Sequence, residues 1–190
     1  GSSGILLVDS INFFSTLGLS LLGVALARSC THGWGSNMTT AQSFGLRLAA
    51  ALWVVWGAVH VFAGIVIIAS PDAASAVQAV ADAVPKAELS FEAHPAASAL
   101  YSQHGWHLGW IGATTIVCAV FLWRGPARGG WRTAAWVAAL TGGLADVGYF
   151  VFMDLGGYVN FLPGGLMTYI SASAILLSFW VWWNERQETN

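Results

Sequence analysis

Residues 46–70 read LRLAAALWVVWGAVHVFAGIVIIAS, a stretch in which Arg47 is the only residue of the Asp, Glu, Lys and Arg types. The hydrocarbon core of a bilayer is about 30 Å thick, and a helix needs about 20 apolar residues to cross it. Because lipid offers no partner to backbone N–H and C=O groups, a crossing segment of this kind has to be helical. Pro71 follows directly and predicts the end of the helix. The stretch therefore predicts a first transmembrane helix over residues 46–70.

Three further stretches have the same character, at residues 104–123, 131–153 and 163–183. The composition agrees, since 56% of the 190 residues are apolar and only 8% are charged, whereas about 25% are charged in a soluble domain. The sequence lacks the alternation that marks a transmembrane strand. We predict an all-α integral membrane protein with a four-transmembrane-helix bundle in residues 38–190, in which the long loop 71–103 joins the first two helices.

Residues 1–37 are harder to interpret. Gly1-Ser2-Ser3-Gly4 resembles the remnant of an expression tag, which says nothing about the fold. Residues 11–27 are apolar enough for a short extra N-terminal membrane helix. Residues 5–37 could equally be an upstream extension or an artefact of expression, and a secretory signal is a further alternative.

The basic residues predict the orientation. If the spans alternate in direction, all of them outside the loop fall on one side of the membrane: Arg28, Arg47, Arg124, Arg128, Arg132 and Arg186. Loop 71–103 falls on the other side, and its charged residues are Asp72, Asp82, Glu88 and Glu92 against the single Lys86. Positive residues are retained on the cytoplasmic side. We therefore expect a multi-pass protein of the cell inner (cytoplasmic) membrane with loop 71–103 outside.

The loop has a pattern of its own. Pro71 and Asp72 suit the first turn of a helix, Val77 and Val80 recur at helical spacing, and Pro85 predicts the end. These residues predict a short amphipathic helix in the outer loop. Because it is acidic, it gains nothing from anionic headgroups, so we expect it to pack on the protein.

Ionisable residues inside the spans are the main candidates for function, because they are costly in lipid and usually face the bundle interior. They are His60, His104, His107 and Asp146. At 1.5 Å per residue, His60 and Asp146 lie about 15 Å and about 12 Å deep. We predict that these two form a hydrogen-bonded pair able to act as the catalytic acid and base.

A ligand pocket is predicted around this pair, open to the outer face. The residues expected to line it are Trp53, Trp56, Tyr149, Thr114 and Ser171. The plainer alternative for Thr114, Ser171 and Ser178 is a hydrogen bond from each hydroxyl to its own helix. Glycines beside the polar residues, Gly57 and Gly64 in the first span and Gly105, Gly109 and Gly112 in the second, predict close helix packing.

Several chemistries remain open. His104 and His107 share one helix face, and with His60, or with His94 or Asp146, they would make a transition-metal site. Axial ligation of haem by His60 and a histidine of the second span is another alternative. Our main hypothesis is a buried His/Asp pocket that binds a small ligand or a metal ion.

Two other functions are kept as alternatives. One is an integral-membrane enzyme, an acid–base isomerase or an oxidoreductase, that uses His60 and Asp146 on a lipophilic substrate. The other is a structural subunit of a membrane complex, and a homo-oligomer also remains open. The sequence has no Gly-rich phosphate loop, no GxSxG and no basic patch suited to nucleic acid.

Overall fold

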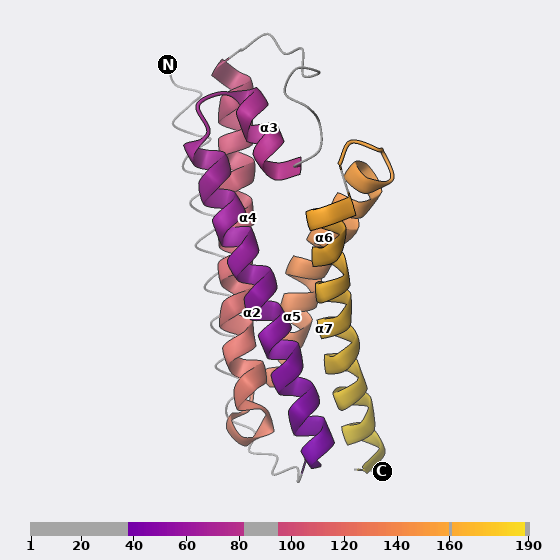
Figure 1. Cartoon of the computed structure of the whole chain (residues 1–190). Helices are drawn as coiled ribbons and strands as arrows, with labels where there is room; N and C mark the ends of the chain where they lie inside the picture. Colours follow the sequence, from indigo (N-terminus) through magenta and orange to yellow (C-terminus); the bar gives the residue numbers. More distant parts are fainter. Residues whose placement is uncertain (1–37, 82–94, 160, 189–190) are drawn as a thin grey trace.

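The computed structural model describes residues 38–81, 95–159 and 161–188, and every regular element in them is helical (Figure 1). The predicted helix in residues 5–37 lies outside these ranges. The elements are α2 (Thr40–Ala69), α3 (Ala73–Ala81), α4 (Pro95–Arg124), η2 (Pro126–Arg128), α5 (Trp131–Ala138), η3 (Ala139–Gly143), α6 (Leu144–Tyr149), η4 (Phe150–Asp154) and α7 (Phe161–Glu188).

Four helical segments are long and apolar enough to cross a membrane: Thr40–Ala69, Pro95–Arg124, Trp131–Asp154 and Gly164–Glu185. This confirms the predicted all-helical fold with four such helices. It is compatible with a multi-pass membrane protein, and the apolar surfaces of the helices suggest a lipid environment.

Two helices begin earlier than hydropathy predicted. α2 begins at Thr40 because Thr39 and Gln42 form a capping box, in which each side chain accepts a hydrogen bond from the backbone N–H of the other residue. α4 begins at Pro95, so the loop assignment is wrong for residues 95–103. Proline is favoured in the first turn, where its missing N–H costs no helical hydrogen bond.

The helix predicted in the outer loop is present as α3. The Asp72 carboxylate accepts the Ser75 N–H at 2.7 Å and so caps the first turn. α3 contacts both α2 and α4, which confirms the expectation that this helix packs on the protein. The predicted end at Pro85 lies outside the described residues.

The third span is irregular in a way that the sequence did not predict. Residues Ala139–Gly143 and Phe150–Asp154 are π-helical, and the short α6 lies between them. Single-turn π segments inside α-helices are rare and occur often at functional sites. Asp146 belongs to the α segment that these two turns enclose.

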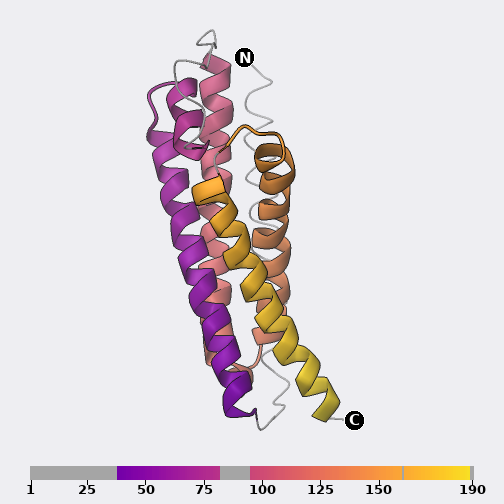
Figure 2. The ribbon, with the colours of Figure 1, turned by 45° about the vertical axis from the view of Figure 1, so that its right-hand side comes forward.

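α2 and α4 are in direct backbone contact, and Figures 1 and 2 show them side by side. A Cβ atom placed on Gly57 would lie 2.5 Å from the carbonyl oxygen of Gly112, and the reverse distance is also 2.5 Å. Gly64 and Gly105 meet in the same manner. These contacts confirm the predicted close packing of small residues. Gly109 differs, since a Cβ there would have nothing within 4 Å.

The two ends of the bundle carry different elements. α3 and the turn after η4 lie at one end, and η2 and the C-terminus lie at the other (Figures 1 and 2). We call these the α3 end and the η2 end. The connection at the η2 end is short because Gly125, Gly129 and Gly130 adopt positive φ angles of 61°, 70° and 77°, which only glycine adopts at low cost.

Candidate functional site

A hydrogen-bonded group of polar side chains lies at the centre of the bundle. Trp56 of α2 is completely buried, and its Nε1–H donates to Oδ2 of Asp146 of α6 at 2.7 Å. Asp146 is only 4% exposed, and the Ser171 side chain of α7 lies within hydrogen-bonding range of its carboxyl group. The carboxyl group thus joins three helices. We call Trp56, His60, Asp146 and Ser171 the central polar group.

His60 belongs to this group through Trp56. Its Nδ1 lies 2.8 Å from the Trp56 carbonyl oxygen, one helical turn earlier, and its ring stacks on the indole at 3.5 Å between centroids. A carbonyl oxygen can only accept, so Nδ1 carries the proton and Nε2 of the neutral ring is an acceptor.

The predicted direct hydrogen bond between His60 and Asp146 is wrong. Trp56 lies between the two side chains and bonds to each of them. The bond to Trp56 turns the imidazole along its own helix, while the longer indole reaches across to the third span. Sequence reasoning named all three residues but assigned the bond to the wrong pair.

Trp53 and Trp56 form part of the packed core. They are 1% and 0% exposed and meet edge to face, with centroids 5.7 Å apart. A Cβ on Gly142 would lie 2.6 Å from the Trp53 ring, so this glycine lets the third span approach. The two rings therefore fill space that the sequence analysis assigned to an open ligand pocket.

The hydroxyl groups in the spans follow the plainer alternative. Thr114 donates to the Trp110 carbonyl at 2.8 Å, and Ser178 donates to the Ala174 carbonyl at 2.8 Å. The Ser171 hydroxyl lies 3.1 Å from the Thr168 carbonyl in addition to its contact with Asp146. Only Ser171 joins the central polar group.

The predicted metal ligands do not form a site in the described part of the chain. His104 and His107 are exposed near one another on α4, and His107 packs edge to face with Trp110. In residues 38–81, 95–159 and 161–188, no group of three or more His, Cys, Asp or Glu side chains could hold a metal ion. His94 lies outside these ranges.

A second polar group lies beside the first, between the third and fourth spans. It comprises Tyr149, Asp154 and Thr168. The Tyr149 hydroxyl, both Asp154 carboxylate oxygens and the Thr168 hydroxyl are buried, and none has a hydrogen-bond partner among the described residues. We call these three residues the unpartnered polar group.

Its members come from both helices. Tyr149 lies near enough to Asp154 for the carboxylate to act electrostatically on its hydroxyl group. Its hydroxyl also lies close to Gly164, where a Cβ would be 2.6 Å away. Thr168 follows Gly164 by one helical turn on the same face. Tyr149 was expected as a ligand residue from the sequence. Asp154 was not, although its place at the end of the predicted third span was a signal.

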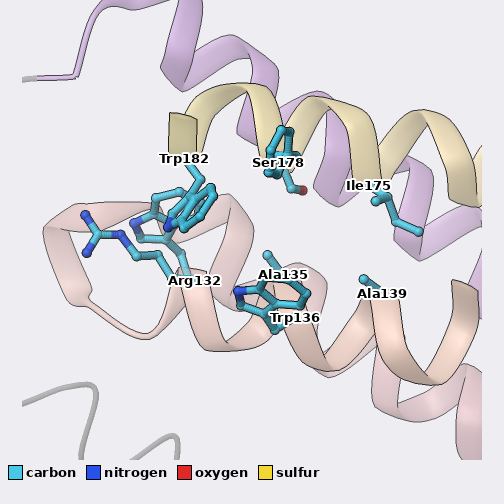
Figure 3. A pocket seen from close by; sticks show the side chains of 9 residues that line it. Arg132, Ala135, Trp136, Ala139, Ile175, Ser178 and Trp182 are labelled. Atoms are coloured by element: carbon cyan, nitrogen blue, oxygen red, sulfur yellow. The ribbon is translucent and has the colours of Figure 1, made fainter. Parts of the chain in front are cut away.

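A pocket also lies between the third and fourth spans, where α5 faces α7 (Figure 3). It contains about 430 Å³ of empty space, part of it open to the surroundings. None of the predicted catalytic, ligand or metal residues lines it. Its lining is Trp131, Arg132, Ala135, Trp136, Ala139, Ile175, Ser178, Phe179 and Trp182.

No protein-family model, curated protein or solved structure matches the chain. Function must therefore be argued from the chemistry of these sites.

Proposed function

We propose that this is a multi-pass membrane protein that binds a small monovalent cation at the unpartnered polar group of Tyr149, Asp154 and Thr168. The observation that supports the proposal is the set of four buried oxygen atoms without partners in the described residues. Buried polar atoms are nearly always satisfied, and a buried carboxylate without a partner is especially costly. A ligand from outside the chain would remove this cost.

The chemistry of the group favours a cation. Asp154 supplies one negative charge, and Tyr149 and Thr168 supply neutral hydroxyl oxygens. Oxygen ligands suit hard metal ions, and a single carboxylate balances a single positive charge. Na⁺ and the ammonium group of a protonated amine share these features. The metal ion of the main hypothesis would thus be held by oxygen ligands rather than by histidines.

Contacts connect this group to the central polar group. The Thr168 carbonyl accepts the Ser171 hydroxyl, which also contacts Asp146. Tyr149 follows Asp146 by three residues and so shares its helix face. Asp154 and Asp146 are about 12 Å apart along the helix. In our proposal Asp154 is the outer residue of a polar line and Asp146 is the inner one.

The same contacts bear on the alternative of an acid–base enzyme. His60 and Asp146 are bridged by the buried Trp56, and an enzyme would need a cavity beside them for its substrate. The pocket between α5 and α7 is lined by other residues. The arrangement gives more support to a binding role for Asp154 and a positioning role for Trp56.

The proposed orientation follows from the ends of the bundle. Asp154 is the last residue of η4, and the turn after η4 lies at the α3 end (Figure 1). The basic residues Arg124 and Arg128 lie at the η2 end. Because positive residues are retained on the cytoplasmic side, the cation site would open on the side of the cell inner membrane that faces away from the cytoplasm.

The test is thermal unfolding of the detergent-purified protein, followed by tryptophan fluorescence, in chloride salts of equal ionic strength. The cations are Na⁺, methylammonium and the bulky N-methylglucamine. We expect Na⁺ or methylammonium to raise the Tm above its value in N-methylglucamine. The shift corresponds to about 2.7 kcal/mol at a hundred times the Kd. The more effective of the two cations identifies the ligand class.

Asp154→Asn should abolish this difference in Tm, because it removes the charge and keeps the shape. Asp72→Asn is the matched control, since Asp72 caps α3 and lies outside the unpartnered polar group. Tyr149→Phe provides a second variant if Asp154→Asn does not fold. A Tm independent of the cation, or an unchanged response in Asp154→Asn, would disprove the proposal.

A further inference from the structure

The pocket between α5 and α7 has a polar end and an apolar end. Arg132 lies at one end, and Ala139 and Ile175 lie at the other (Figure 3). The distance from Arg132 to Ala139 along the helix is about 10 Å. Aromatic rings of Trp136 and Trp182 lie between these ends. A site with this polarity matches an amphiphile, whose charged group would lie at Arg132.

Arg132 can bind a second acceptor. It forms an ion pair with Glu185, with one terminal nitrogen 2.8 Å and Nε 3.3 Å from the same carboxylate oxygen. Glu185 is buried, whereas the Arg132 side chain is 47% exposed. A guanidinium group carries five N–H donors in a planar fork that suits phosphate oxygens. Glu185 therefore fixes the position of Arg132 and leaves donors on its exposed side.

The charge around the polar end favours an anion. Arg124 and Arg128 are exposed at the same η2 end. Arg47 belongs to this end as well, because its guanidinium lies 5.9 Å from the Trp123 ring, beside the last residue of α4. Basic side chains gathered at a membrane surface attract anionic lipid headgroups.

From this combination we propose that the pocket between α5 and α7 binds an anionic phospholipid, with its phosphate at Arg132 and an acyl chain along Trp136 and Trp182 toward Ala139. The proposal commits to a lipid because the apolar part lies on a helix surface suited to hydrocarbon, while the polar part matches a phosphate. It does not depend on the cation site at the other end of the bundle.

The full chain is placed in phosphatidylcholine bilayers to which a lipid with brominated acyl chains is added. The brominated lipid is phosphatidylglycerol in one series and phosphatidylcholine in the other. Bromine quenches nearby tryptophan fluorescence, and Trp136 and Trp182 line the pocket. We expect the binding constant from quenching to be roughly fivefold higher for phosphatidylglycerol, the size of one favourable charge contact. Equal quenching by both lipids would overturn the proposal.

Matched variants separate this site from general attraction to the basic end. Arg132→Gln should bring the ratio of the two binding constants close to one, whereas Arg124→Gln should leave it nearly unchanged.

Ala139→Phe should reduce quenching by filling the apolar end of the pocket, and Ala113→Phe, at an exposed position of α4, should not. Ala139→Phe leaves the ion pair with Glu185 intact, so it tests the site even if Arg132→Gln is unstable. An equal effect of Arg132→Gln and Arg124→Gln would overturn the assignment.

Discussion

Replacement of Trp56 by alanine is expected to destabilise the bundle by about 3–5 kcal/mol, the usual cost of removing a large buried aromatic side chain. Trp56 is 0% exposed, contacts Trp53 and His60, and donates a hydrogen bond to the buried Asp146. The substitution therefore creates a cavity and removes a donor from a buried carboxyl group. The measurement is the free energy of unfolding in mixed detergent micelles.

Three further variants separate the causes of the stability lost in Trp56→Ala. Trp106→Ala is the control, because Trp106 is 58% exposed and its loss leaves no cavity. Trp56→Phe should cost about 1–3 kcal/mol for the missing indole donor, together with a smaller cavity than that of Trp56→Ala. Adding Asp146→Leu to Trp56→Phe should recover part of that loss, because both partners are then apolar. If Trp56→Ala and Trp106→Ala were equally stable, the central position of the Trp56–Asp146 bond would be refuted.

Replacement of Gly112 by alanine should cost about 1–3 kcal/mol, the range found for overpacking. The new methyl group would lie 2.5 Å from the Gly57 carbonyl oxygen, and a backbone atom cannot move aside as a flexible side chain can. We expect the contact between α2 and α4 to open, and the same unfolding measurement would detect it.

Gly109→Ala is a matched control on the same helix. A Cβ at Gly109 has nothing within 4 Å, and alanine favours a helix by about 1 kcal/mol over glycine. This variant should be neutral or slightly more stable than the original protein. A loss of stability as large as that of Gly112→Ala would show that the effect of Gly112→Ala is not specific to its contact with Gly57.

The candidate site was predicted in part. The sequence singled out Trp56, His60, Asp146, Tyr149 and Ser171 because each is a polar or aromatic residue within an apolar span. The structure brings Trp56, Asp146 and Ser171 together but joins His60 to Asp146 only through Trp56, whose backbone carbonyl contacts His60 and whose indole donates to Asp146. The positions of these residues along the sequence predicted their depth in the membrane. The length of each side chain decided which of them form hydrogen bonds.

The structure at the α3 end was likewise predicted only in part. Pro71 and Asp72 predicted a helix after the first span, and the Asp72 cap is present. The helical start of α4 at Pro95 was missed because residues 95–103 are too polar for a hydropathy pattern to mark them as part of a span. The π-helical turns on both sides of Asp146 had no signal in composition, because they depend on how the third span packs.

The sequence by itself determined the number and the helical nature of the four long apolar segments. Hydropathy is a local property, and in lipid a long apolar segment can satisfy its backbone only as a helix. Only the tertiary structure decided how each helix is rotated, and hence that the side-chain oxygens of Tyr149, Asp154 and Thr168 are buried and that a pocket ends at Arg132. A helix in lipid is apolar on its outer face as well as its inner face. Hydropathy therefore carries little information about how a helix is rotated about its axis. That rotation is fixed instead by side-chain shape, by glycine contacts and by the few polar groups that must find partners.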